Sequence, residues 1–173
     1  MGRSREKVME VVEKRLGELE ERLTRNGIDD IPVGVENMGN RGEFGGPLED
    51  ILDICSLSDI LVPMIDWGHL QATSDGSLEG PDDFLAVLGL VEDRLGRDGL
   101  GGTCHQFSQV EYSDGMERKH VAYDQGDMRL EDLLEALEET GLSETTLISE
   151  SPSMEDHRKM LGIVRAAKEG GVQ

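Results

Sequence analysis

Each of four expected strands ends in, or contains, a side chain that can bind a divalent metal. Glu36 ends the first strand and Asp66 ends the second, with His69 three residues later. His105 lies on the third strand and Glu150 ends the fourth. Carboxylate oxygens and imidazole nitrogens together suit Zn²⁺, Mn²⁺ or Mg²⁺. A cation would also offset the repulsion among three gathered carboxylates, which would otherwise raise their pKa values.

Each of these residues also has a structural interpretation. The carboxylates Glu36, Asp66 and Glu150 could cap helices or hold loops where strands meet helices. His69 could cap a helix or lie exposed in a loop. We favour metal ligation because the same residue types recur at the ends of four successive strands.

Strand and helix patterns alternate along the chain and would position these residues. A helix at 4–25 is followed by four units of strand and helix, because apolar residues recur first at helical spacing and then in short buried runs. Alternation of this kind favours a parallel sheet, with functional side chains at the carboxyl ends of its strands. The expected strands are 31–36, 60–65, 103–110 and 145–149. The helices expected after them are 47–56, 81–95, 130–137 and 154–168. The expected loops are 37–46, 71–80 and 113–127.

The predicted fold is α/β, a partial (β/α)8 TIM barrel in one domain over 1–173, with about four parallel strands each followed by a helix. A complete barrel needs about 250 residues, so at 173 residues the N-terminal strands of a barrel are absent. Three explanations remain open: an N-terminally truncated product, a second chain that completes the barrel, or self-association of two copies. Unpaired strand edges favour association.

The chain is strongly acidic. Its 37 acidic and 17 basic residues give a net charge of -20. Such a charge repels nucleic acid and anionic membranes at ordinary ionic strength. The even spread of Asp and Glu favours a halophilic interpretation, a cytoplasm of very high salt in which the repulsion is screened. We expect a cytoplasmic protein with no membrane partner, because no apolar stretch approaches 18 residues.

Five short strings occur in the same order as motifs of a known family. They are VEN at 35–37, IDWGH at 65–69, HQFS at 105–108, RKH at 118–120 and SESP at 149–152. Through them the chain resembles endonuclease IV-like proteins (AP endonuclease family 2) of the xylose isomerase-like TIM barrel superfamily, archaeal branch, C-terminal half only. The resemblance implies metal ligands at Glu36, Asp66, His69, His105, His120 and Glu150, with Glu36 and Glu150 as the catalytic, bridging carboxylates.

The resemblance also implies a reaction and a cofactor. The reaction is metal-dependent hydrolysis of a phosphodiester at an abasic site, in DNA repair, with Zn²⁺ favoured and Mn²⁺ or Mg²⁺ as alternatives. Two positions depart from the family pattern. Arg118 stands where the bacterial endonucleases place an Asp, two residues before the last His, and an Arg cannot ligate a cation. HQFS lacks the usual polar run after its His, which leaves the register of His105 open by one residue.

Two other functions remain open at this point. By the resemblance, Glu36, Asp66, His105 and Glu150 also match the four ligands of the single-metal site in related sugar isomerases and epimerases, where His69 would contact substrate. The substrate would then be a sugar or sugar phosphate instead of abasic DNA. The third alternative is an inactive remnant or a structural subunit.

Overall fold

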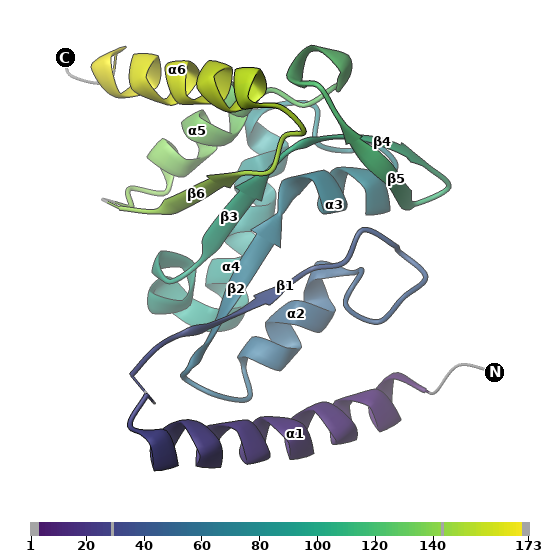
Figure 1. The fold of residues 1–173 in the computed structure, drawn as a ribbon, viewed down its shortest axis with the longest axis vertical. Coiled ribbons are helices and arrows are strands. Elements are labelled where there is room, and N and C mark those ends of the chain that lie inside the picture. Colours follow the sequence, from purple (N-terminus) through teal and green to yellow (C-terminus); the bar gives the residue numbers. More distant parts are fainter. Residues whose placement is uncertain (1–3, 29, 143, 171–173) are drawn as a thin grey trace.

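The computed structural model describes residues 4–28, 30–142 and 144–170, and helices connect the four strands of its parallel sheet (Figure 1). The strands are β1 (Val33–Glu36), β2 (Leu61–Asp66), β3 (Cys104–Phe107), β4 (Gln109–Ser113), β5 (Met116–Val121) and β6 (Thr146–Ser149). The helices are α1 (Arg5–Asn26), α2 (Leu48–Cys55), α3 (Trp67–Thr73), α4 (Pro81–Gly101), α5 (Leu130–Glu139) and α6 (Met154–Gly170), with one 3-10 turn, η1 (Tyr123–Gln125).

Four strands form a parallel sheet in the order β1-β2-β3-β6. Glu36 pairs with Met64, Asp66 pairs with Gln106, and Gln106 pairs with Ile148. Paired residues in neighbouring strands point to the same face of a sheet, as do residues two apart in one strand. Glu36, Asp66 and Gln106 therefore share one face, at the carboxyl ends of their strands. The prediction of a partial TIM barrel with about four parallel strands is confirmed.

The opposite face of the sheet carries the core. Ile65 of β2 and Phe107 of β3 are fully buried, together with Leu52 of α2, Leu88 of α4 and Leu133 of α5. Aliphatic side chains supply most of this core, in keeping with the low aromatic content of 3%, and Trp67, Phe84 and Phe107 are its largest members. Burial of these side chains against the helices holds the strands in place and so fixes the strand ends.

The face that carries Glu36 and Asp66 is more open away from the strand ends. Gly34, Thr146 and Ile148 of this face are exposed, although parallel sheets are generally covered on both sides. No described helix is both long and apolar enough to cross a lipid bilayer.

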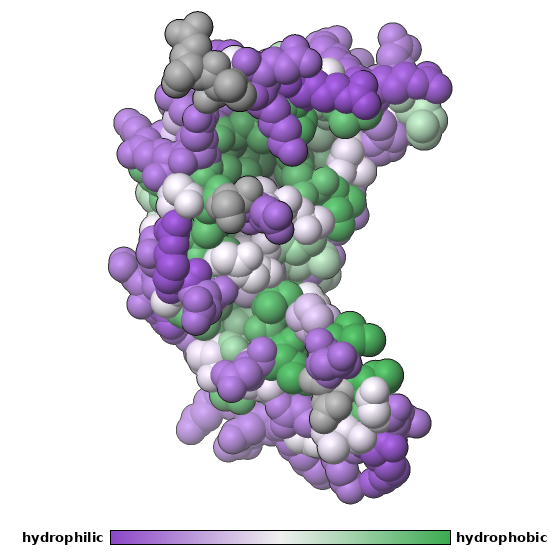
Figure 2. All heavy atoms as spheres, turned by 90° about the vertical axis from the view of Figure 1, so that its left-hand side faces the viewer, coloured by the Kyte–Doolittle hydropathy of each residue, from purple (hydrophilic) through white to green (hydrophobic). Residues whose placement is uncertain are grey.

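A separate groove of 770 Å³ lies at the amino-terminal ends of β3 and β6, between α5 and α6. Apolar side chains of Leu134, Leu137, Leu142 and Val164 contribute to its lining. Figure 2 shows hydrophobic atoms exposed in a hollow on this side of the molecule. The groove is thus at the opposite end of the sheet from the carboxyl ends of the strands.

Two segments differ from the predicted elements. The strand predicted over 103–110 is broken at Ser108 into β3 and β4, and the loop predicted over 113–127 contains β5 and η1. β5 was missed because its sequence, MERKHV, is polar on both faces, as the strand of a two-stranded hairpin at the surface can be. The hairpin of β4 and β5 packs on α3 (Figure 1), which was also not predicted as a helix.

Candidate metal centre

Asp66 joins β2 to α3 and is held from two sides. Its Oδ1 caps α3 by accepting a hydrogen bond from the backbone N–H of His69 at 2.9 Å. The buried side chain of Asn37 accepts from the backbone N–H of Asp66 at 2.8 Å and donates to its carbonyl at 3.0 Å. Burial raises the pKa of Asp66, although His69 opposes the shift. Its Oδ2 is buried without a hydrogen-bond partner among the described residues, a position that a cation would satisfy.

Three more side chains gather beside Asp66 from the other strand ends, and with it form the strand-end group: Glu36, Asp66, Gln106 and Glu150. Gln106 Nε2 donates to Glu150 Oε1 at 2.7 Å, while Gln106 Oε1 is buried without a partner in the described chain. Burial, then repulsion from Asp66 and Glu150, raises the pKa of Glu36. The strand-end group thus concentrates negative charge around two buried oxygens that lack donors, which fits a bound cation.

His69 lies on the first turn of α3 and has its two ring nitrogens in different environments. Nδ1 is 2.6 Å from the backbone carbonyl oxygen of Asn37, and because a carbonyl only accepts, Nδ1 carries the proton. Nε2 lies 2.9 Å from Glu117 Oε2 and is the nitrogen available to a metal. Although burial alone lowers the pKa of His69, the hydrogen bond to Glu117 and the charge of Asp66 raise it to about 9.

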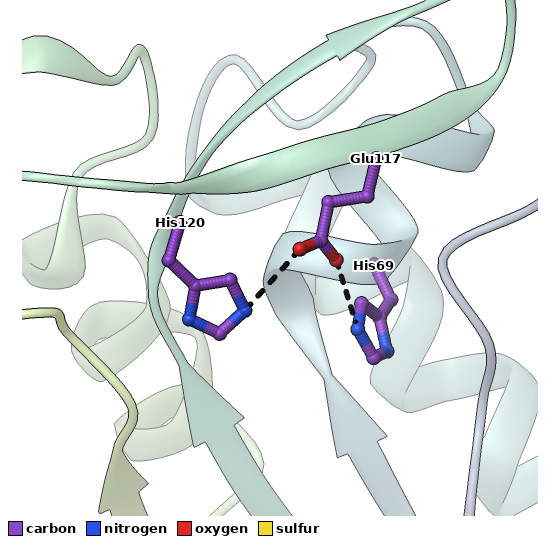
Figure 3. A group of neighbouring side chains, drawn as sticks. All are labelled: His69, Glu117 and His120. Carbon is purple, nitrogen blue, oxygen red and sulfur yellow. Dashed lines mark ion pairs between the residues drawn. The ribbon is translucent and has the colours of Figure 1, made fainter.

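Glu117 of β5 lies between two histidines (Figure 3). Its Oε1 is 3.3 Å from His120 Nε2, and its Oε2 contacts His69. His120 Nδ1 is 2.8 Å from the carbonyl oxygen of Glu150. Both histidines therefore turn Nδ1 to a backbone carbonyl and Nε2 to the carboxylate, which is how metal-binding histidines are commonly oriented. We call His69, Glu117 and His120 the hairpin group; one donor atom from each lies within 4.8 Å of the other two.

A bulge in the hairpin brings Glu117 and His120 to the same face. Residues three apart on a regular strand point to opposite faces. Here Glu117 pairs with Tyr112 and His120 pairs with Val110, because the register shifts by one residue at Arg118. Tyr112 and Val110 are two apart, so their partners share a face. Arg118 itself is no ligand, as predicted from its chemistry, but Glu117 supplies the carboxylate beside His120.

The expectation that His105 is a metal ligand is corrected by its place in the sheet. His105 pairs with Ile65 and Leu147 and so points to the core face, away from Gln106. Its ring is fully buried and stacks on Trp67, with centroids 5.9 Å apart and planes 18° apart. Neither ring nitrogen has a hydrogen-bond partner among the described residues, and burial lowers the pKa of His105 to about 4.

The other predicted ligands are brought together. The strand-end group and the hairpin group contain Glu36, Asp66, His69, His120 and Glu150. Two residues of the groups were not predicted, namely Gln106 and Glu117. Gln106 follows His105 directly, and the open register of HQFS was the signal that pointed to it.

Comparison with known proteins places this geometry in a family. The chain matches the family model described as xylose isomerase-like TIM barrel over residues 1–169. It is 32% identical over 120 residues to an uncharacterized protein of Methanocaldococcus jannaschii. The aligned region covers 69% of this chain and 43% of that protein.

Two crystal structures share the fold. A D-tagatose 3-epimerase-like protein has a TM-score of 0.59 and 24% identity, over 91% of this chain and 53% of that one. AsfvAP:AG has a TM-score of 0.58 and 9% identity, over 79% of this chain and 53% of that one. The chain spans about half the length of these relatives. It belongs to the xylose isomerase-like TIM barrel family.

Proposed function

We propose that the chain carries part of the catalytic centre of a metal-dependent phosphodiesterase of the abasic-site endonuclease type. The observation that supports this is the position of Glu117, between two histidines and directly beside the strand-end group. A single-metal isomerase needs only the strand-end residues. Two adjoining sets of donors instead suit two neighbouring ions, which, when bound, neutralise a phosphodiester and activate water.

The residues of the chain have distinct roles in this proposal. Glu150 links the two groups, since its carbonyl accepts from His120 and its carboxylate accepts from Gln106. Glu36 is partly exposed, with 37% of its side chain accessible, and burial raises its pKa. An accessible carboxylate at this position would orient the attacking water beside the bound ions. Asp66 and His69 are held by Asn37 and position the site.

The net charge of -20 shapes how DNA would approach. At low ionic strength the acidic surface repels the phosphate backbone, whereas molar salt screens this repulsion within a few ångströms. Cleavage of DNA should therefore be faster at molar KCl than at low KCl, opposite to the usual trend for DNA-binding proteins. A high-salt cytoplasm is the compartment that we propose on the same ground.

The direct test is incubation of the protein with a duplex that contains one abasic site, at low and molar KCl, with and without added Zn²⁺ and Mn²⁺. Glu117→Gln should abolish cleavage, because it removes the carboxylate shared by His69 and His120. Glu111→Gln is the matched control, because Glu111 lies on the same hairpin, is exposed, and forms an ion pair with Lys119. Equal cleavage by both variants, or none by the metal-loaded wild type, would contradict the proposal.

A second candidate, a metal-dependent sugar isomerase or epimerase, is favoured by the fold likeness to the D-tagatose 3-epimerase-like protein. In that case the strand-end group alone would hold the metal. Conversion of ketohexoses, followed by chromatography, tests it directly. Loss of all metal on mild dialysis would instead favour an inactive subunit.

The open face and edges of the sheet bear on either function. In the described chain β1 and β6 are each paired on one side only, and closed barrels of this type have eight strands. We propose that another chain, either a second copy or a different protein, pairs with these two edge strands. Light scattering after size-exclusion chromatography distinguishes a monomer of 19.0 kDa from a dimer.

A further inference from the structure

We propose that the two groups of the centre select different metals, with Zn²⁺ in the hairpin group and a hard cation, Mn²⁺ or Mg²⁺, in the strand-end group. This inference rests on the metal centre of the proposed function, but not on the reaction or its substrate. It follows from which donor atoms each group presents.

The hairpin group presents two nitrogens and one carboxylate. His69 and His120 each have Nδ1 within 2.8 Å of a backbone carbonyl oxygen, so Nδ1 keeps its proton and Nε2, which faces Glu117, is the nitrogen that a metal would bind in place of a proton. Glu117 contacts both Nε2 atoms through its two carboxylate oxygens. Two imidazoles and one carboxylate, with a fourth position open, are the donor set of catalytic Zn²⁺ sites.

The strand-end group presents oxygen only. His105, which would have supplied a nitrogen, points to the core face, and Gln106 stands at the end of β3 in its place. Because Gln106 donates through Nε2 to the carboxylate of Glu150, the free atom of its amide is Oε1. That atom and Asp66 Oδ2 are buried without hydrogen-bond partners in the described chain, in residues only 6% and 0% exposed.

His69 does not add a nitrogen to the strand-end group. The nitrogen nearest to Glu36 and Asp66 is Nδ1, at 3.6 and 3.7 Å, and this nitrogen is engaged with the carbonyl of Asn37. The strand-end group therefore consists of three carboxylates and one amide oxygen. Such all-oxygen sets suit Mg²⁺ and Mn²⁺, whereas imidazole favours Zn²⁺.

The test measures metal content and does not depend on activity. Metal-free protein is given one equivalent each of Zn²⁺ and Mn²⁺, desalted, and analysed by mass spectrometry of the metals and by electron paramagnetic resonance of Mn²⁺. Wild type should retain one equivalent of each ion. His120→Ala should lose Zn²⁺ and keep Mn²⁺. Gln106→Leu should lose Mn²⁺ and keep Zn²⁺.

A gain-of-ligand variant provides the complementary measurement. Gln106→His places an imidazole at the strand-end group, so the protein should take up a second equivalent of Zn²⁺ when Zn²⁺ is in excess over Mn²⁺, at the expense of Mn²⁺. Circular dichroism verifies that each variant is folded. A wild type that binds Zn²⁺ but retains no Mn²⁺, or loss of Mn²⁺ in His120→Ala, would overturn the inference. A phosphodiesterase assay that fails while this metal division holds would refute only the proposed function.

Discussion

His105 offers a sharp test of how the site is assembled. If it lies in the core, as its pairing with Ile65 and its stacking on Trp67 place it, its replacement should leave metal binding intact and change only the response of stability to acid. If it were a ligand, replacement would remove metal. His105→Phe keeps an aromatic ring against Trp67 and removes the titrating group.

The size of the acid response follows from the pKa of His105, which burial lowers from 6.5 to about 4. The unfolded state therefore binds a proton before the folded state does, so this residue destabilises the fold as the pH falls below 6.5. Linkage gives a loss of about 2 kcal/mol between pH 7 and pH 5 for a group with these two pKa values. His105→Phe should show no such loss of stability, because phenylalanine does not titrate.

Urea unfolding of metal-free wild type and His105→Phe, at pH 7 and pH 5, measures the effect. Between pH 7 and pH 5 the free energy of unfolding of wild type should fall by about 2 kcal/mol more than that of His105→Phe. Other titrating groups, including the carboxylates of the strand-end group, are present in both proteins and cancel in this comparison. A shift near zero, or loss of bound Zn²⁺ or Mn²⁺ in the variant, would refute the assignment of His105 to the core.

Three further predictions use other parts of the structure. Asn37→Ala leaves two buried backbone groups of Asp66 without partners, so urea unfolding should show a loss of about 2–3 kcal/mol, and Zn²⁺ titration should show affinity weakened about tenfold. Burial raises the pKa of the Cys55 thiol to about 12, so a disulfide reagent at pH 8 should modify it only after denaturant is added. The net charge of -20 predicts that the melting temperature rises with KCl; a temperature that falls from low to molar KCl would contradict this.

Much of the fold could be predicted from the sequence because its signals are local. Apolar runs such as IPVGVE and the helical spacing of the apolar residues after them indicated the alternation of strands and helices, and the structure confirms it. The hairpin of β4 and β5 could not be predicted in this way. Its second strand is polar on both faces, and its pairing depends on contacts with α3 that no local pattern records.

The candidate site could be predicted where a ligand directly ends a strand. Glu36, Asp66 and Glu150 follow from that rule, since the carboxyl ends of parallel strands meet at one edge of a sheet. His105 was misplaced because the face that a strand residue adopts changes with every single step along the chain. The actual strand begins at Cys104 and pairs Gln106 with Asp66, and only the register of the neighbouring strand fixes this.

Glu117 was missed for a related reason, and the reason yields a final test. Glu117 and His120 are three residues apart, so on a regular strand they would point to opposite faces. The bulge at Arg118 places them on the same face. Deletion of Arg118 should therefore leave Glu117 opposite Tyr112 and His120 opposite Val110, now two apart on a regular strand, with Zn²⁺ binding retained. Deletion of both Arg118 and Lys119 should put the two ligands on opposite faces and abolish Zn²⁺ binding. Equal loss of Zn²⁺ in the single and double deletions, with both proteins folded, would show that the bulge does more than restore the alternation of faces.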